Sequence, residues 1–304
     1  MDSWEAGRIA VEASLLEVSG TPKPGNVHRL AGLPDLSYED FLKGAPCLFE
    51  PSARAYAEAS KGRARVGYLI KLGVSLMLKA TGGKNTHLGT LILAVPTSAA
   101  AALGVELGEA LMEVLSACTS EDSAMLAEAI RASGSSVVGE LRDSKLDVWS
   151  MTQPPPLLEL LEEASSWDVL CRELVKGLPA SRSALKVYAS LASVDLNAAC
   201  VHTYLTILAS QPDTHVARKA GMRLGYRDPR DAVEAGMPVA RWVSEYARRV
   251  LDAGGLLAPA GRALAWRMDR ELRSRGLSPG ASADLTALSI MLYTLSKRGL
   301  PVLG

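Results

Sequence analysis

The stretch Thr81–Gly89, read T-G-G-K-N-T-H-L-G, gathers several reactive side chains between two apolar, helix-patterned segments. Its glycines let the backbone adopt positive φ and let a ligand approach closely. Lys84, Asn85, Thr86 and His87 offer hydrogen-bond donors where a new helix is expected to begin, and a helix start attracts anions through its free N–H groups. The alternative is a turn between helices in which Asn85 or Thr86 serves only as the N-cap.

A second polar stretch, T-P-K-P-G-N-V-H-R, covers Thr21–Arg29. Two prolines and a glycine predict an extended, turn-rich backbone that excludes helix. Lys23 and Asn26 are placed on this stiff frame, and a rigid loop loses less entropy when a ligand binds. A plain surface loop is the alternative.

A third polar stretch, Q-P-D-T-H-V-A-R-K-A-G, covers Gln211–Gly221. Asp213 falls at an expected helix start, and Arg218 and Lys219 follow one turn later. These residues are expected to bind an anion and its metal ion. The alternative is that Asp213 caps the helix and Arg218 is solvated.

The fourth stretch, L-S-P-G-A-S-A-D-L, opens the last expected helix at Leu277–Leu285. Ser282 and Asp284 stand near its N-terminus. An acidic residue in that place is most often a partner of the helix dipole, so this stretch alone carries little weight.

Together, the four stretches contain the side chains that hold a Mg²⁺-bound polyphosphate. Carboxylates bind the metal ion, whereas Lys, Arg and helix N-termini bind phosphate oxygens. The inventory is Lys23, Lys84, Arg218 and Lys219; Asp213 and Asp284; and His28, His87 and His215. The chain has neither a P-loop nor a Rossmann glycine motif. Spacing alone does not show whether the stretches converge.

Hydrophobic periodicity predicts an all-α protein. Almost no segment alternates with period two, and most place apolar residues at i, i+3, i+4 and i+7. The expected helices include Ser3–Val18, Ser120–Ala132, Asp195–Ser210 and Val239–Asp252. We expect residues 1–304 to form one all-helical domain. The prolines of Gln153–Pro156 mark sub-lobes 1–150 and 157–304 that are not expected to fold independently.

Composition narrows the functional classes. Lys+Arg 33 against Asp+Glu 33 gives a net charge of +0, which argues against a general nucleic-acid binder. The most apolar segment, Leu88–Leu103, is shorter than the roughly 20 residues needed to span a bilayer. The four cysteines form no C-x-x-C motif and indicate a reducing compartment. We expect a cytoplasmic protein that does not associate with membranes, and a homodimer because of its apolar helices.

The four stretches, in this order, resemble the signature motifs of the triphosphoribosyl-dephospho-CoA synthase family. The resemblance runs from residue 21 to residue 285. It implies an all-helical enzyme that uses Mg²⁺ and transfers a triphosphoribosyl group from ATP to the ribose 2′-hydroxyl of dephospho-CoA, releasing adenine. This chemistry resembles glycoside transfer.

The resemblance carries over residue by residue to this sequence. Asp213 and Asp284 are expected to bind the metal ion or act as base, and His87 is expected to take part in proton transfer or to position the nucleotide. The remaining matched residues are expected to bind nucleotide or phosphate: Lys23, Asn26, Lys84, Asn85, Thr86, Arg218, Lys219 and Ser282.

The sequence also departs from the family pattern. Asp35 is the one acidic counterpart after the first motif, the helix before Thr81 lacks an expected glutamate, and Leu88 replaces a basic residue. Because of these changes, the sequence does not determine the acceptor substrate. The alternatives are a nucleotide hydrolase or N-glycosidase on the same scaffold, and a non-catalytic nucleotide-binding protein.

Overall fold

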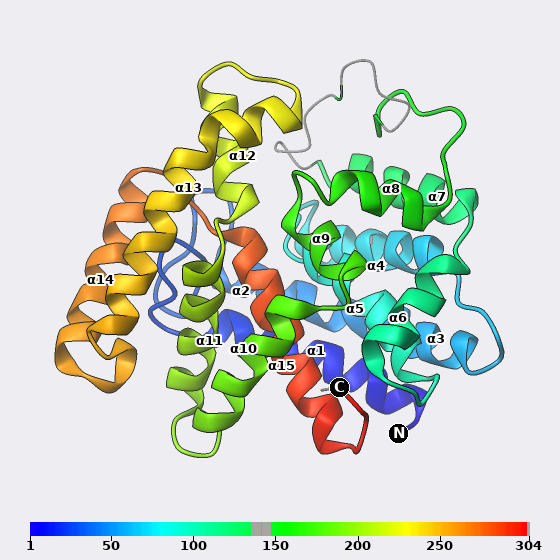
Figure 1. The fold of residues 1–304 in the computed structure, drawn as a ribbon, viewed down its shortest axis with the longest axis horizontal. Helices are drawn as coiled ribbons and strands as arrows, with labels where there is room; N and C mark the ends of the chain where they lie inside the picture. The colour runs from blue at the N-terminus through cyan, green and yellow to red at the C-terminus, as the bar shows by residue number, and fades with distance from the viewer. Residues whose placement is uncertain (135–140, 142–146, 303–304) are drawn as a thin grey trace.

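The computed structural model describes residues 1–134, 141 and 147–302. The described residues form helices and no β-strand; the β-type pairing among them consists of two isolated antiparallel bridges, His28–Ala31 and Leu33–Leu36. The predicted all-α class is confirmed (Figure 1). None of the helices in these ranges is long and apolar enough to cross a membrane.

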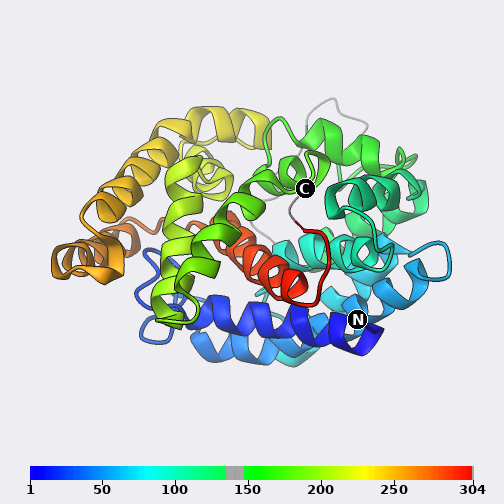
Figure 2. The ribbon, with the colours of Figure 1, turned by 60° about the horizontal axis from the view of Figure 1, so that its bottom comes forward.

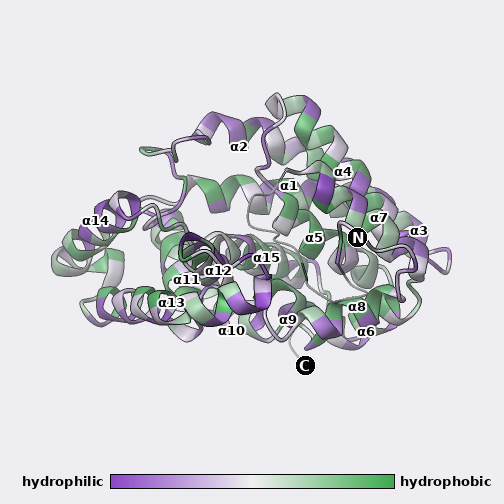
Figure 3. Cartoon of the chain, turned by 90° about the horizontal axis from the view of Figure 1, so that it is seen from above, coloured by the Kyte–Doolittle hydropathy of each residue, from purple (hydrophilic) through white to green (hydrophobic). Residues whose placement is uncertain are grey.

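The helices of the first half are α1 (Ser3–Ser19), α2 (Tyr38–Gly44), the 3-10 helix η1 (Ala45–Leu48), α3 (Phe49–Ala59), α4 (Val66–Thr81), α5 (Leu88–Ala101), α6 (Leu107–Ser116) and α7 (Ser120–Ala132). Of these, α1, α3, α4 and α6 pack against α5. In Figure 3, α5 is coloured mostly hydrophobic, and its side chains from Leu93 to Ala101 lie almost wholly inside the core.

The second half supplies the remaining walls. Its helices are α8 (Leu157–Ala164), α9 (Val169–Val175), α10 (Pro179–Leu191), α11 (Leu196–Ser210), α12 (Thr214–Arg223), α13 (Pro229–Asp252), η2 (Gly255–Leu257), α14 (Pro259–Ser274) and α15 (Gly280–Lys297). Helices α11 to α14 gather on one side of the molecule, whereas α3 to α8 lie on the other (Figures 1 and 2).

Helix α15 lies between these two groups and packs against α1, α5, α10 and α11. The larger hydrophobic cluster combines residues from both sides of Gln153–Pro156, such as Ile9, Leu91, Leu185 and Leu292. The smaller cluster joins α11 to α14. The apolar core therefore does not divide at the proline linker. Whether any part folds independently stays a prediction.

Helix α13 differs from the sequence-based expectation, which began it at Val239. In the structure it begins ten residues earlier, with Asp228 as N-cap, and it continues through Pro238. Two glycines explain the earlier start. A Cβ on Gly221 of α12 or on Gly236 of α13 would collide with backbone of the opposite helix. Because these two glycines have no side chain, α12 and α13 pack closely, and this contact stabilises the first turns of α13.

Candidate active site

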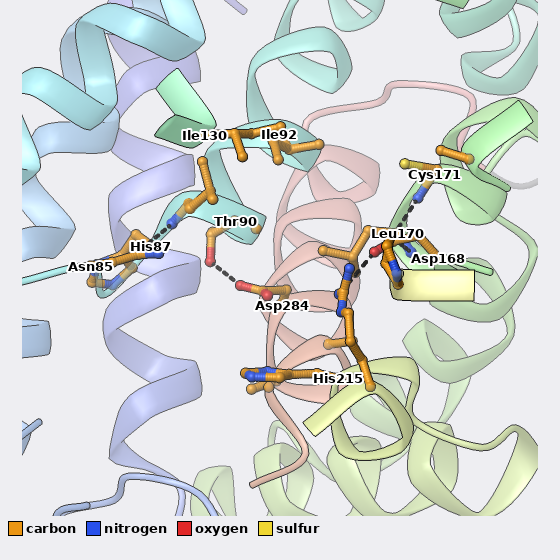
Figure 4. Close-up of a pocket in the computed structure, with 18 of the residues that line it drawn as sticks. Asn85, His87, Thr90, Ile92, Ile130, Asp168, Leu170, Cys171, His215 and Asp284 are labelled. Atoms are coloured by element: carbon orange, nitrogen blue, oxygen red, sulfur yellow. Dashed lines mark hydrogen bonds and ion pairs between the residues drawn. The ribbon is translucent and has the colours of Figure 1, made fainter. Parts of the chain in front are cut away.

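A cavity of about 310 Å³ lies where α1, α5, α7, α8, α9, α12 and α15 meet. Polar residues from all four predicted motifs contribute to its lining: Asn26, Asn85, Thr86, His87, Arg218 and Asp284. Apolar side chains of α5, α7, α8 and α9 complete it, among them Ile92, Ile130, Leu161 and Leu170. Figure 4 shows Asp284 between Ile92 and Ile130 on one side and His215 on the other.

Asp284 provides a carboxylate in the cavity lining. Its Oδ1 accepts a hydrogen bond of 2.7 Å from the hydroxyl of Thr90 on α5. A Cβ on Gly89 would collide with its Oδ2, so this glycine is required for the carboxylate to lie against α5. Burial, with smaller contributions from the charges of Glu17 and Asp213, raises the pKa of Asp284 to about 7. Asp284 can therefore take up or release a proton near neutral pH.

A buried ion pair lies beside the cavity. Lys23, 1% exposed, donates to Oε1 of Glu17 and, at 3.2 Å, to the Glu17 carbonyl. Glu17 lies in the last turn of α1 and lines the cavity. Burial raises the pKa of Glu17, and Lys23 opposes this shift. The ammonium of Lys23 therefore serves first to neutralise Glu17 and does not itself line the cavity.

The Asn85–His87 stretch forms the start of α5. Asn85 Oδ1 accepts from the Leu88 amide at 3.2 Å, and Thr86 Oγ1 lies 2.7 Å from His87 Nδ1. Burial, followed by the charge of Lys23, lowers the pKa of His87 to about 3, so the ring is neutral at physiological pH. Its Nε2 is buried without a hydrogen-bond partner in the described part of the chain.

Arg218 is the cation that the described lining presents to the cavity. Its Nη2 donates to Asp168 Oδ2 at 3.2 Å, and its buried Nε has no partner in the described ranges. His215, one turn earlier on α12, also lines the cavity. Burial, followed by the charges of Arg218 and Lys219, lowers the pKa of His215 to about 4.

The start of α15 completes this wall. Pro279 is its N-cap and provides no side-chain cap, and Gly280 and Ala281 line the cavity. A Cβ on Gly280 would collide with Nδ1 of His215. Of its first three amides, Gly280 N–H donates to the Ser278 carbonyl at 2.9 Å and Ser282 N–H to Asp213 Oδ2 at 2.8 Å. The Ala281 amide has no acceptor among the described residues, so this terminus offers one donor to a ligand in the cavity.

Asp213 and Ser282, both predicted as site residues, lie outside the cavity lining. Asp213 caps α12 through the Val216 amide at 3.0 Å, and its Oδ2 accepts from the amide and the hydroxyl of Ser282, both at 2.8 Å. Burial raises the pKa of Asp213, whereas these hydrogen bonds lower it. Together the two residues join α12 to α15.

Three other predicted residues also lie away from the lining. Lys84, on the surface, forms an ion pair of 2.7 Å with Asp40. Burial is the main cause that lowers the pKa of Lys219, which does not line the cavity. His28 is fully buried beside Asp269 and Trp266. The assignment of Lys84 and Lys219 to phosphate stays a prediction.

Sequence reasoning missed Glu17, Thr90 and Asp168. Glu17 precedes the proline-rich loop by one turn and resembles any polar residue of an amphipathic helix. Thr90 lies one turn into α5, immediately after the recognised motif. Asp168 shows an ordinary N-cap signal for α9, where its Oδ1 accepts from the Leu170 and Cys171 amides. No sequence signal links these three residues. The folded structure shows that they share one site, because all three line the cavity.

The fold and the site first define a class. An all-helical chain surrounds a cavity whose lining includes an arginine and a carboxylate able to exchange a proton near neutral pH. Such a combination is typical of an enzyme site.

The comparisons with known proteins identify the family. Residues 3–301 match the ATP:dephospho-CoA triphosphoribosyl transferase family, and the chain belongs to it. It is therefore a transferase. The 2-(5''-triphosphoribosyl)-3'-dephosphocoenzyme-A synthase of Pectobacterium atrosepticum is 30% identical over 94% of this chain and 87% of that protein. The enzyme of the same name from Klebsiella pneumoniae is 30% identical over 93% of this chain and 88% of that protein.

A crystal structure from Archaeoglobus fulgidus, of a candidate triphosphoribosyl-dephospho-CoA synthase, has a similar fold. Its TM-score is 0.59 at 24% identity, and the match covers 84% of this chain and 97% of that chain. At this identity the similarity concerns the fold.

Proposed function

We propose that this protein transfers the triphosphoribosyl group of ATP to the ribose 2′-hydroxyl of dephospho-CoA in a Mg²⁺-dependent reaction that releases adenine. The observation that carries the proposal is the convergence of all four polar motifs on one cavity around Asp284. Family membership supports the same donor and acceptor.

The triphosphate is assigned to the wall formed by Arg218 and the start of α15. Arg218 offers donors beyond the one that binds Asp168, and α15 offers the Ala281 amide, since those of Gly280 and Ser282 already donate to Ser278 and Asp213. A guanidinium and helix amides are both suited to phosphate oxygens. His215 stays neutral because of its low pKa and contributes a hydrogen bond here.

The donor set fits a metal ion that arrives with the nucleotide. No three His, Cys, Asp or Glu side chains of the described chain come together as a ready-made metal site. Mg²⁺ in nucleotide enzymes commonly uses one or two carboxylates together with substrate phosphates. Among the described lining residues, four carboxylates face one cation, Arg218; they are Glu17, Asp147, Asp168 and Asp284. A Mg²⁺ ion bound to the nucleotide would add positive charge beside them.

We assign the metal contact to Glu17 in place of Asp213, because both oxygens of Asp213 already accept hydrogen bonds from α12 and α15. Glu17 has one oxygen that forms no hydrogen bond with any described residue. When bound, Mg²⁺ would neutralise charge on the triphosphate. With the metal ion assigned to Glu17, Asp284 is assigned to accept the proton of the acceptor hydroxyl.

The bond changes balance with Asp284 as base. The C1′–N9 bond of ATP breaks, and its electron pair goes to the purine. The 2′-oxygen of the acceptor forms a bond to C1′, and its proton passes to the free oxygen of Asp284. The purine takes up one proton, so adenine leaves neutral, and Asp284 returns its proton to water.

The test is a reaction of the purified protein with ATP, Mg²⁺ and dephospho-CoA, analysed by mass spectrometry. Adenine and triphosphoribosyl-dephospho-CoA are expected together, with both lost on chelation of Mg²⁺ by EDTA. Adenine alone would point to hydrolysis or to another acceptor. Neither product, with no ATP binding by calorimetry, would overturn the proposal.

A further inference from the structure

One corner of the cavity, around Phe41 and His87, combines apolar side chains with two polar ones. Leu33 and Leu36 from the loop before α2, Phe41 from α2 and Leu88 from α5 line the same cavity as Asn85 and His87. Phe41 and His87 meet edge to face with ring centroids 5.2 Å apart. Apolar and aromatic faces with a few polar groups at the edge are the usual surroundings of a bound nucleobase.

The imidazole of His87 is held in one orientation. Its Nδ1 lies 2.7 Å from Thr86 Oγ1, Phe41 lies against the ring, and a Cβ on Gly44 would collide with Thr86 Oγ1. His87 is 2% exposed, yet its Nε2 has no partner in the described ranges. A buried polar atom without a partner is costly, and a ligand that fills its hydrogen bond is one explanation.

Asn85 offers a second donor at this corner. Its Oδ1 caps α5 through the Leu88 amide, and its Nδ2 makes no hydrogen bond to any residue that the structure describes. Both side chains lie at the N-terminus of α5, a helix of 14 residues, where the helix dipole favours negative charge.

We propose that this corner binds the leaving adenine of ATP, with Phe41 against the base and His87 Nε2–H donating to a purine ring nitrogen. The inference rests on the proposed function and names the base subsite. This role requires the tautomer in which the Thr86 hydroxyl donates to Nδ1 across the 2.7 Å contact and the ring hydrogen lies on Nε2. A neutral imidazole acts here as a hydrogen-bond donor, since its low pKa excludes an imidazolium near neutral pH.

The leaving base is the occupant because its charge changes during the reaction. As the C1′–N9 bond breaks, the electron pair moves onto the purine. The donors of His87 and Asn85 and the positive end of α5 stabilise that charge. The adenine of dephospho-CoA keeps its glycosidic bond and gains no charge, so it would derive no such benefit.

Free adenine tests the subsite directly. Equilibrium dialysis with radiolabelled adenine should show binding to the wild type and at least about tenfold weaker binding to Phe41→Leu, because base stacking on an aromatic ring is lost. The chain contains two phenylalanines. The second, Phe49, packs against Trp4 and is absent from the lining, so Phe49→Leu is the matched control. Equal affinities for the two variants, or no binding by the wild type, would overturn the proposal.

A change of leaving group tests the role of His87. With ATP, His87→Ala should lower kcat by about 10². With 8-azaadenosine triphosphate, whose base leaves more readily, the loss should be several-fold smaller, because less charge needs stabilisation. His202 lies outside the cavity lining and accepts from the Leu256 amide at 2.9 Å, so His202→Gln is the control. Its ratio of wild-type to variant kcat should be the same with ATP as with 8-azaadenosine triphosphate. An equal loss for both nucleotides in His87→Ala would reject the donor role.

The proposed transferase function and the proposed base subsite can be contradicted separately. If no adenine is released from ATP under any condition, the proposed transferase function fails. If transfer proceeds but Phe41→Leu and Phe49→Leu behave alike, the transferase function stands and the base subsite lies elsewhere.

Discussion

Asp284 makes activity depend on pH. In the proposed reaction its ionised form takes the proton of the acceptor hydroxyl, and its pKa is raised to about 7 mainly by burial. The value of kcat/KM for dephospho-CoA should therefore rise with pH through about 7 and then level off. A steady-state pH profile at saturating Mg²⁺ measures this rise. A profile that falls over the same range would contradict the role of base.

The same carboxylate should reduce stability. A raised pKa means that the folded state binds the Asp284 proton more tightly than the unfolded chain. The contribution of Asp284 to stability is therefore present at acid pH and is lost as pH rises from the unfolded value of 3.8 to about 7. Asp284→Asn removes the buried charge and keeps an acceptor for Thr90.

We expect Asp284→Asn to lose activity and, above pH 7, to gain about 1 to 3 kcal/mol in free energy of unfolding. Urea denaturation at two pH values measures the gain, which should shrink at acid pH. A variant less stable than the wild type at both pH values would contradict this expectation.

Among the elements, α12 and α15 are joined by one carboxylate. Asp213 caps α12 and binds the amide and the hydroxyl of Ser282. In Asp213→Asn, the side-chain oxygen of Asn can still accept a hydrogen bond. Its NH₂ group, however, would face a backbone N–H of either Val216 or Ser282, and two donors cannot bond to each other. We expect a loss of about 1 to 3 kcal/mol in unfolding free energy, together with weaker ATP binding because the start of α15 shifts.

Asp195 provides the matched control for this prediction. It caps α11 through the Ala198 amide at 2.8 Å and is exposed. Since Asn caps helices about as well as Asp, Asp195→Asn should cost less than about 0.5 kcal/mol. Thermal denaturation with and without ATP compares the two variants. Equal, small effects in both would mean that Asp213 is only a cap.

Gly89 fixes the approach of α5 to α15. A Cβ at this position would meet Asp284 Oδ2 and, at 2.9 Å, Leu170 Cδ1. Both atoms are ends of side chains, so the helices can stay folded while the carboxylate is displaced. Gly89→Ala should therefore lower kcat by about 10² or more, with far-ultraviolet circular dichroism unchanged. Full activity would show that the position of Asp284 is not critical.

Most elements could be predicted from the sequence because their signals are local. The helix at Ser120–Ala132 has the predicted bounds, and the loop from Thr21 to Arg29 contains no helix. The first turns of α13, which the expected helix from Val239 leaves out, could not be predicted from local signals. Their stability depends on close packing between Gly221 and Gly236, which lie on different helices.

At the scale of the whole molecule, the polar motifs could be found from the sequence but their roles could not. Asp213 and Asp284 both stand near helix starts in the sequence, yet one joins two helices and the other lines the cavity. Glu17 gave no sequence signal because its role depends on Lys23 and on burial by distant helices. The polar motifs come together only through the packing of distant helices, so their spacing along the chain could not predict that they line one cavity.

The most direct test of the central claim is simultaneous quantification of adenine and triphosphoribosyl-dephospho-CoA in one reaction, for the wild type and Asp284→Asn. Equal amounts of the two products are expected from the wild type, and neither product is expected from the variant. Full activity in Asp284→Asn would contradict the assigned base. Adenine in excess of the transferred product would contradict the assigned acceptor.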